Sequence, residues 1–479
     1  MTAETQDSKK VIPIQAVAAE DEEMVSLYAA AKKIYPRSVE GIFAYWRWVV
    51  VAITQIVFYG LPWMEWGARQ AVLFDLTARR FYIFGLVLYP QDFIYLTGLL
   101  VISALSLFLF TAVAGRLWCG YACPQTVYSE IFLWIERKVE GDRSARMRLD
   151  EASYSASKLG KKSLKHFLWI VLSLWTGFTF VGYFAPIRDL GADLLLNQVS
   201  AWGIFWILFY AFATYGNAGF MREQVCKYMC PYARFQSAMF DHDTLIVTYD
   251  TERGEPRGAR SKKTDIKTAN LGACVDCTLC VQVCPTGIDI RNGLQYECIG
   301  CGACADVCDS VMDKMGYARG LVRYTTQNAM ANKWTTGQML RRVARPRVLM
   351  YTSFLLALVI AVGASLAMRT PFKVDVVRDR ATLARITENG ALENIYRLQV
   401  MNASEVNKTY ALSVQGLNGI DIVTDKTVEV GAAQAKWVVV RVNVPYGTAQ
   451  AGSHKIEFTI QDAASSDALH EKSVFLVPR

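Results

Sequence analysis

Charged residues are scarce in this sequence of 479 residues. Asp, Glu, Lys and Arg make up 20% of the chain, whereas a soluble domain carries about 25%. Hydrophobic residues make up 53%, so a disordered tail protein, a secreted enzyme and a plain cytosolic enzyme are all disfavoured. The 51 Lys and Arg against 43 Asp and Glu leave a net charge of +8. Because this excess lies beside apolar runs, it does not indicate a nucleic-acid-binding protein.

Several signatures are also missing. No P-loop, dinucleotide-binding fingerprint or nucleophile–base motif is present, so the sequence offers no site of its own for a nicotinamide or flavin. No cleavable signal peptide is expected, because about forty mostly polar residues precede the first apolar run. The twelve cysteines are too few per residue for a small disulfide scaffold, and none lies beyond Cys308.

Five apolar runs have the length of about 20 residues that a transmembrane helix needs. They are approximately Ile42–Tyr59, Phe93–Ala114, His166–Phe184, Trp202–Phe220 and Val348–Met368. A run of this kind can also be a buried core helix, but aromatic residues typical of membrane interfaces flank the first run. These are Trp46, Trp48, Trp63 and Trp66. Arg47 lies near enough to the start of that run for its side chain to reach toward the membrane surface.

The basic residues predict the orientation of the spans. The loop after the second run is rich in Lys and Arg, as is the stretch between the fourth and fifth runs, whereas the loops after the first and third runs are not. We therefore expect a multi-pass inner-membrane protein with its amino terminus in the cytoplasm and its carboxyl terminus across the membrane. The predicted segments are a polar cytoplasmic segment (1–40), a membrane domain with four spans and a basic loop (41–220), a cytoplasmic segment (221–347), a fifth transmembrane helix (348–368) and a periplasmic domain (371–479).

The last predicted segment has the pattern of β-structure. Tyr396–Val400, Thr409–Val414, Lys436–Val444 and His454–Ile460 alternate apolar and polar residues and are rich in β-branched side chains. Short polar turns separate these runs at intervals typical of an all-β, immunoglobulin-like sandwich. Because the segment contains no cysteine, its fold must rest on a hydrophobic core.

Eight cysteines form two copies of one pattern. Each copy is Cys-x-x-Cys-x-x-Cys-x-x-x-Cys, starting at Cys274 and at Cys298. A tight turn of this kind supplies three thiolates to a 4Fe–4S cluster, and in two-cluster ferredoxins the fourth comes from the other copy. We therefore predict a ferredoxin-like domain at about 265–315. The first cluster is assigned to Cys274, Cys277, Cys280 and Cys308, and the second to Cys298, Cys301, Cys304 and Cys284.

One departure from the usual motif and one alternative metal bear on the assignment of these cysteines to two clusters. Pro285 follows Cys284, whereas Asp309 follows Cys308, so the second copy departs from the usual ending without losing a ligand. The alternative is a pair of zinc sites, which usually show two Cys-x-x-Cys pairs without the third cysteine in the run. The tripled run favours iron–sulfur clusters.

The other four cysteines form a second repeated pattern. Cys119 and Cys123 follow the second apolar run, Cys226 and Cys230 follow the fourth, and each pair ends in Cys-Pro. Residues four apart lie on one side of a helical turn, so both sulfurs of a pair can point at one ion. Together the two pairs could hold a soft metal such as Cu(I), bind a further cluster or act as redox dithiols, or they could be buried small hydrophobes.

This order of features resembles the cytochrome c oxidase accessory protein family, known as CcoG, FixG or RdxA. The resemblance rests on both Cys-x-x-x-Cys-Pro units, the ferredoxin-type pair, the segment Asp243–Gly258 and the terminal β-domain, and covers nearly the whole chain beyond residue 40. It implies a bacterial protein that reduces Cu(II) to Cu(I) for copper-centre assembly of a cbb-type cytochrome oxidase. Copper is then a substrate or transient ligand, and copper chaperones or oxidase assembly factors are expected partners.

The sequence thus predicts a multi-domain membrane protein with an α-helical bundle of five spans, a cytoplasmic domain with two 4Fe–4S clusters and a terminal β-sandwich. The expected activity is that of an oxidoreductase, a cupric reductase fed by an unknown cytoplasmic electron donor. Membrane lipid is an expected partner, nucleic acid is not, and a homodimer is one option. Two alternatives remain open: an electron-transfer subunit between a membrane quinol and a redox partner, and an oxidase assembly scaffold whose clusters are structural.

Overall fold

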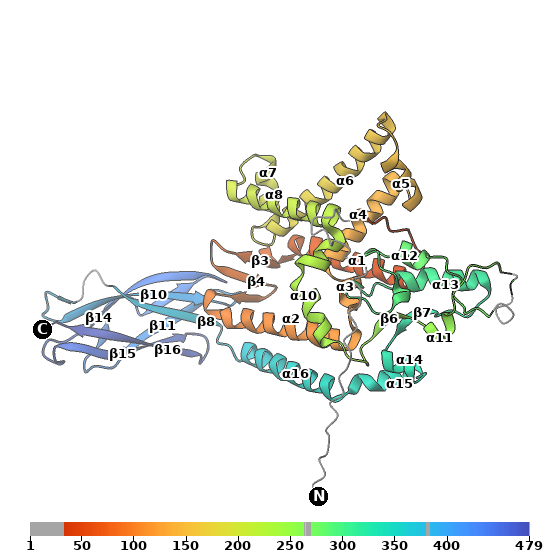
Figure 1. Cartoon of the computed structure of the whole chain (residues 1–479). Helices are drawn as coiled ribbons and strands as arrows, with labels where there is room; N and C mark the ends of the chain where they lie inside the picture. Colours follow the sequence, from red (N-terminus) through yellow and green to blue (C-terminus); the bar gives the residue numbers. More distant parts are fainter. Residues whose placement is uncertain (1–32, 263, 265–269, 380–383, 479) are drawn as a thin grey trace, which may run out of the picture.

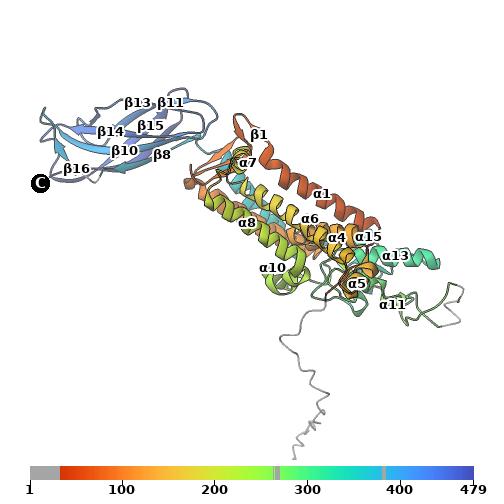
Figure 2. The same cartoon turned by 90° about the horizontal axis from the view of Figure 1, so that it is seen from above.

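The computed structural model describes residues 33–262, 264, 270–379 and 384–478. Most of the predicted polar segment 1–40 and the start of the predicted ferredoxin domain, 265–269, therefore lie outside the described residues. The described chain is elongated, with a β-domain at one end, a cysteine-containing domain at the other and long helices between them (Figures 1 and 2). We call these two ends the β-domain end and the cysteine end.

Five described helices are long and apolar enough to cross a membrane, which confirms the predicted number of spans. They contain α1 (Ile42–Gly60), α2 (Phe93–Ala114), α6 (Ala156–Val181), α8 (Ala201–Gly216) and α16 (Pro346–Ala367). The fourth span extends beyond α8 to Met229. Many of their large apolar side chains are exposed, among them Ile56, Leu100 and Phe212. Exposed apolar surface on long helices is what contact with lipid requires.

Two of the spans differ from the sequence prediction at their ends. Helix α6 starts about ten residues earlier than expected, so its basic first turns are also helical. Ser155 caps this earlier start, because its side chain accepts a hydrogen bond from the Lys158 backbone N–H. Helix α8 ends at Gly216 and continues into two π-helical segments, Asn217–Met221 and Val225–Met229, separated by α9 (Arg222–Gln224). Segments of π-helix are rare and often occur at functional sites.

Shorter helices fill the cysteine end. They are α3 (Leu117–Tyr121), α4 (Pro124–Glu140), α5 (Arg143–Glu151), α10 (Pro231–Phe235), α11 (Thr251–Gly254), α12 (Leu279–Gln282), α13 (Ala303–Met315), α14 (Gln327–Ala331) and α15 (Thr336–Arg341). One further helix, α7 (Ile187–Leu195), lies between α6 and α8 in the chain, at the end of the bundle away from α5 (Figure 1).

The β-domain is a sandwich of two sheets, as predicted. One sheet has the order β12-β14-β10-β8 with β9 paired to β10, and the other has the order β13-β11-β15-β16. The strands are β8 (Phe372–Arg378), β9 (Arg385–Ile386), β10 (Leu392–Asn402), β11 (Lys408–Gln415), β12 (Asp421–Ile422), β13 (Thr427–Val430), β14 (Ala435–Val444), β15 (Gly452–Asp462) and β16 (Ala468–Val477). The alternating side chains meet in a fully buried core that includes Tyr396 and Phe458, whose ring centroids lie 5.0 Å apart.

The loop after α1 is folded, which the sequence analysis missed. It contains β1 (Glu65–Trp66), β2 (Arg69–Gln70), β3 (Val72–Asp75), β4 (Arg80–Ile83) and β5 (Leu86–Leu88). Strands of two to four residues are too short to show a convincing two-residue alternation. Leu73, Tyr82 and Val87 from this loop share a small core with Met401 and Ala433 of the β-domain.

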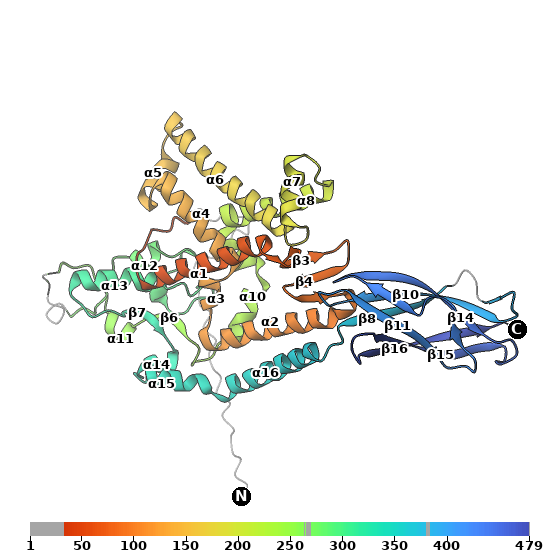
Figure 3. The same ribbon diagram turned by 180° about the vertical axis from the view of Figure 1, so that it is seen from behind.

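Polar contacts also attach the β-domain to the bundle. Asp92, which is buried and precedes α2, forms ion pairs with Arg369, at 3.0 Å, and with Lys373. Arg369 lies between α16 and β8, and Lys373 lies in β8. The Tyr89 hydroxyl donates to the carbonyl oxygen of Asn402 at 2.9 Å. The first extramembrane loop, with β3 and β4, and the β-domain therefore lie at the same end of the bundle, while α5 of the basic loop and the cysteine-bearing helices α12 and α13 lie at the other (Figure 3).

Candidate metal centres

The cysteine-containing domain is built around a two-stranded sheet in which β6 (Ile246–Tyr249) pairs with β7 (Val322–Thr325). Val247, Ile290 and Met312 form its buried core, and several of the cysteines pack against this core. The ligand loops are therefore held on a hydrophobic support.

The two ligand loops repeat the same backbone conformation. Asp276 and Gly300 occupy equivalent positions, two residues after the first cysteine of each copy, and both have positive φ angles of 51° and 66°. Thr278 and Gly302, two residues further on, also have positive φ angles of 57° and 72°. Positive φ angles cost conformational energy for a residue with a Cβ atom but not for glycine. In the first copy the surrounding structure must therefore hold Asp276 and Thr278 in this conformation, whereas in the second copy Gly300 and Gly302 adopt it without that cost.

Two cavities divide the eight ferredoxin-type cysteines into two groups. Cys274, Cys277, Cys280 and Cys308 line one of them. The other is lined by Cys284, Cys298, Cys301 and Cys304, together with Cys280, which borders both cavities. These groups are the same as the two ligand sets derived from the spacing, although ligation by the individual residues stays a prediction.

The donors fit 4Fe–4S clusters better than single metal ions. Among the residues that the structure describes, no three His, Cys, Asp or Glu side chains converge as the ligands of one ion do. Four thiols spread around a cavity are instead what a cubane cluster needs, because it binds one thiolate at each iron corner. Bound clusters would supply one-electron transfer at each of the two sites.

Burial raises the pKa of several thiols that line the two cluster cavities. It raises the pKa of Cys298 and of Cys308 to about 12 and that of Cys280 to about 11. Iron binds the thiolate form, so cluster assembly must displace protons from these buried groups.

The Cys-x-x-x-Cys-Pro units do not form the single helical turn that the sequence analysis predicted. Cys119 lies in α3, which ends at Tyr121, and Cys123 is in an extended conformation before α4. Cys226 lies in the second π-helical segment, and Cys230 is again extended. The reason is the proline, whose ring disfavours helical geometry in the residue before it.

Both units nevertheless reach the same region, which we call the four-cysteine site (Cys119, Cys123, Cys226 and Cys230). Burial raises the pKa of Cys119 to about 11, the side chain of Gln236 lowers it by donating a hydrogen bond to the sulfur, and the nearby Cys123 and Cys230 thiols raise it. Burial likewise raises the pKa of Cys123, and Cys230 contributes to that rise. The two units are therefore close enough to interact electrostatically.

Helix α3 packs directly against the loop of the second cluster site. A Cβ atom added to Gly120 would lie 2.8 Å from the Cα atom of Cys301 and 2.8 Å from the carbonyl oxygen of Ile299. No side chain separates the two backbones there. The four-cysteine site thus adjoins the second cluster site, and only glycine at position 120 permits this contact.

The start of α1 is also covered by the cluster domain, which corrects the prediction for Arg47. Its side chain is 9% exposed, and its Nη1 atom lies 3.9 Å from Oε2 of Glu130 on α4 instead of reaching the surface. The Asp306 carboxylate, on the ligand helix α13, accepts hydrogen bonds from the backbone N–H groups of Phe43 and Ala44 at 3.1 and 2.7 Å. Asp306 therefore caps α1 and joins it to the ligand helix.

A buried ion cluster links the two Cys-x-x-x-Cys-Pro units. Glu136, on the helix that follows Cys123, accepts a hydrogen bond from Arg146 at 2.8 Å and forms an ion pair with Arg222 at 2.9 Å. Arg222 lies four residues before Cys226 and has a φ angle of 30°. Burial acts to raise the pKa of Glu136, but Arg222, Arg146 and Lys165 outweigh it and hold that pKa below its usual range.

Comparison with known proteins identifies the same parts of the chain. A family model described as a 4Fe-4S dicluster domain matches residues 221–327, and one described as a 4Fe-4S binding domain matches residues 96–140. The second match covers Cys119 and Cys123. A third model, described as an IG-like fold at the C-terminal of FixG, matches residues 362–478.

Fold and site together define a multi-pass membrane protein of iron–sulfur electron transfer with an immunoglobulin-like carboxyl-terminal domain. The chain is 39% identical over 422 residues to the nitrogen fixation protein FixG of Rhizobium meliloti, covering 82% of this chain and 80% of that protein. It is 36% identical over 469 residues to protein RdxB of Cereibacter sphaeroides, covering 95% of this chain and 98% of the relative. Protein RdxA of the same organism is 38% identical over 407 residues, covering 82% and 84%. The chain belongs to the FixG family, which confirms the resemblance stated from the sequence.

Proposed function

We propose that this protein delivers single electrons from its two cluster sites to copper at the four-cysteine site, reducing Cu(II) to Cu(I). The observation that carries the proposal is the direct packing of Gly120, between Cys119 and Cys123, on the loop of Ile299 and Cys301. Because of this contact, electrons would pass from a cluster bound at the second cluster site to the four-cysteine site. Clusters bound in the two cavities would exchange one electron at a time, which is the number that Cu(II) needs.

Thiols of the four-cysteine site supply the chemical preference, and two of them suffice because no three converge on one point in the described chain. Thiolate sulfur is a soft ligand and favours Cu(I), so the site would hold the product oxidation state in preference to the substrate. Gln236 keeps the Cys119 sulfur oriented by a hydrogen bond of 3.1 Å. The ion pair of Glu136 with Arg222 keeps the second unit beside the first. The chain's own residues therefore position the thiols, while the electrons arrive from outside.

The wider role follows from the predicted orientation. The basic loops at the cysteine end favour a cytoplasmic position for that end under the positive-inside rule, with the β-domain in the periplasm. Cu(I) formed at the four-cysteine site would be passed to copper chaperones or assembly factors of a cbb-type oxidase. The β-domain is the part of the chain available to periplasmic partners.

The test uses full-length protein purified without oxygen. Its clusters are reduced with dithionite, excess reductant is removed, and Cu(II) is added with a Cu(I)-specific chelator. Two one-electron clusters predict about two Cu(I) per chain. Replacement of all four residues of the four-cysteine site by serine should abolish this yield while about eight iron atoms per chain are retained. An unchanged Cu(I) yield in that variant would remove the site from the mechanism.

A further inference from the structure

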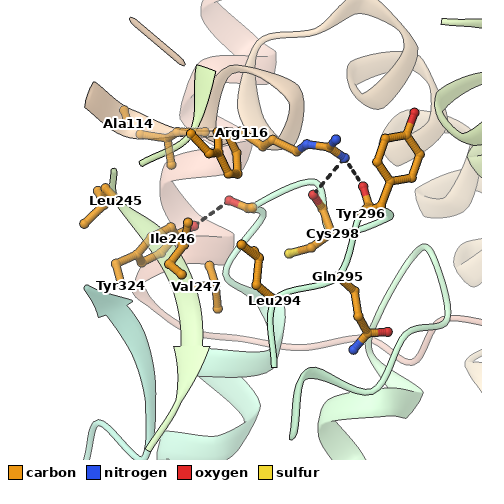
Figure 4. A pocket seen from close by; sticks show the side chains of 13 residues that line it. Ala114, Arg116, Leu245, Ile246, Val247, Leu294, Gln295, Tyr296, Cys298 and Tyr324 are labelled. Carbon is orange, nitrogen blue, oxygen red and sulfur yellow. Dashed lines mark hydrogen bonds between the residues drawn. The ribbon is translucent and has the colours of Figure 1, made fainter. Parts of the chain in front are cut away.

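A cavity of about 260 Å³ lies beside the second cluster site, outside both ligand cavities. Cys298 is part of its wall (Figure 4). Most of the wall is apolar, and Leu294, Ile246 and Val247 gather at its centre. The cavity is not needed to hold a cluster, because the four predicted cluster-two ligands line a different cavity.

The position of the cavity relates it to the membrane. Ala114, the last residue of the apolar helix α2, lines one wall, and Leu245, whose backbone N–H donates to Val113 at 3.0 Å, lines the same cavity. At the rim, Leu294 is 45% exposed and Tyr296 is 38% exposed. Exposed apolar and aromatic side chains next to the end of a span are typical of the membrane–water interface. The cavity thus opens where lipid-soluble molecules are concentrated.

The few polar groups of the wall are fixed in place. The Arg116 guanidinium donates to the carbonyl oxygens of Tyr296 and Cys298, the latter at 3.4 Å, and stacks on the Tyr296 ring at 4.9 Å. The Tyr324 hydroxyl donates to the Gly300 carbonyl oxygen at 2.7 Å and lies 3.3 Å from the Tyr121 hydroxyl, so it is held by two partners within the protein. An apolar cavity with a few oriented polar groups is the common form of a small-molecule site.

We propose that this cavity binds the ring of a quinol, and that a membrane quinol is the electron donor of the protein. A flat apolar ring with hydroxyl groups suits the apolar walls, and the Arg116 guanidinium in the wall can donate to a ring oxygen. Contact of the same cavity with Cys298 puts the ring beside a ligand of the second cluster. The inference rests on the proposed function, since it names the source of the electrons used there.

The step balances without a further reactant. The quinol loses two electrons and two protons and becomes the quinone. The two cysteine sets would hold clusters that can each take up one of the electrons, and the protons leave to water at the exposed rim. Two electrons stored in this way would match the reduction of two Cu(II) ions.

Binding can be measured separately from activity. Full-length protein with both clusters is photolabelled with an azido-quinone, with menadione and duroquinone as competitors that represent naphthoquinones and benzoquinones, and the label is mapped by mass spectrometry. Cluster reduction by menadiol or duroquinol is followed in parallel by EPR. The informative variant is Ala114→Phe, which fills the cavity, and the matched control is Ala104→Phe on the exposed surface of the same helix.

We expect label on the peptides that contain Leu245–Val247 or Leu294–Cys298, a decrease of about tenfold in Ala114→Phe and no change in Ala104→Phe. If Ala114→Phe fails to retain iron, Leu294→Ser at the rim replaces it and should weaken labelling in iron-replete protein. Absence of label from these peptides, or equal labelling of the cavity variant and its control, would overturn the proposal. Persistent dithionite-driven Cu(I) formation would then show that only the donor, and not the proposed function, is wrong.

Discussion

The side-chain amide of Gln236 donates a hydrogen bond to the sulfur of Cys119 across 3.1 Å. Gln236 is fully buried, and its Oε1 atom has no hydrogen-bond partner within the described part of the chain. A group that orients a metal ligand typically contributes about 10- to 100-fold to metal affinity. We therefore expect Gln236→Leu to lower Cu(I) affinity by about tenfold in a chelator competition. Gln461→Leu, on the exposed surface of the β-domain, serves as the control and should have wild-type affinity.

Gly120 should be sensitive to even the smallest side chain. An alanine Cβ atom would lie 2.8 Å from the backbone of Cys301, so α3 and the cluster loop must move apart. We expect Gly120→Ala to slow Cu(I) formation by the dithionite-reduced protein while its iron content stays near that of the wild type. The control is Gly160→Ala, because a Cβ atom on Gly160 meets nothing within 4 Å. Equal rates for the two variants would contradict the role of this contact.

The crossed ligand sets predict the iron content of single-cysteine variants. Cys308→Ser should remove the first cluster and Cys284→Ser the second, so each variant should contain about four iron atoms per chain instead of about eight. The EPR spectra of the two reduced variants should differ and should together account for the wild-type spectrum. If both variants lost the same cluster, the crossed assignment would be wrong.

Asp306 should stabilise the junction between α1 and the ligand helix. Its carboxylate accepts two backbone hydrogen bonds at the amino terminus of α1. Loss of a helix cap costs about 0.5–2 kcal/mol, so Asp306→Ala should lower the free energy of unfolding by that amount. Asp313→Ala is the control on the same helix, because the described partner of Asp313 is the exposed Arg319, and the loss of this surface pair should have little effect. Thermal unfolding of both variants in detergent checks the difference.

The Glu136 cluster predicts a dependence of stability on pH. Because the pKa of Glu136 is depressed in the folded protein, its contribution is present above the ordinary carboxylate pKa of about 4.3 and is lost as the pH falls through the lower folded value. Removal of one partner of a buried ion pair costs about 3–5 kcal/mol. Glu136→Ala should therefore unfold more easily at neutral pH and show a smaller loss of stability on acidification than the wild type. An acid response identical to that of the wild type would contradict this assignment.

Patterns that depend on nearby residues were predicted well from the sequence. Helix α2 begins and ends where its uninterrupted apolar run does, at Phe93 and Ala114, because lipid-facing helices need continuous apolar character. The cysteine spacing likewise anticipated how the eight thiols divide between two cavities. In both cases the local sequence contains the physical cause.

Contacts between distant residues were not predictable in this way. Gln236 and Cys119 are 117 positions apart, and neither a motif nor a periodicity connects them. The partner of Arg47 depends on how α4 packs beside α1, and a charge near the start of an apolar run is equally compatible with exposure. The conformation of Cys123 was predictable in principle, because Pro124 alone excludes a continuous helical turn.

Helix α2 gives the molecule a mechanical connection between its two ends. At one end, Asp92 is tied by ion pairs to Arg369 and Lys373, and so to the first strand of the β-domain. At the other end, Ala114 forms part of the wall beside Cys298. The 22 residues of the helix span about 33 Å without interruption. The same helix therefore meets the attachment of the β-domain at one end and the cavity next to the second cluster site at the other.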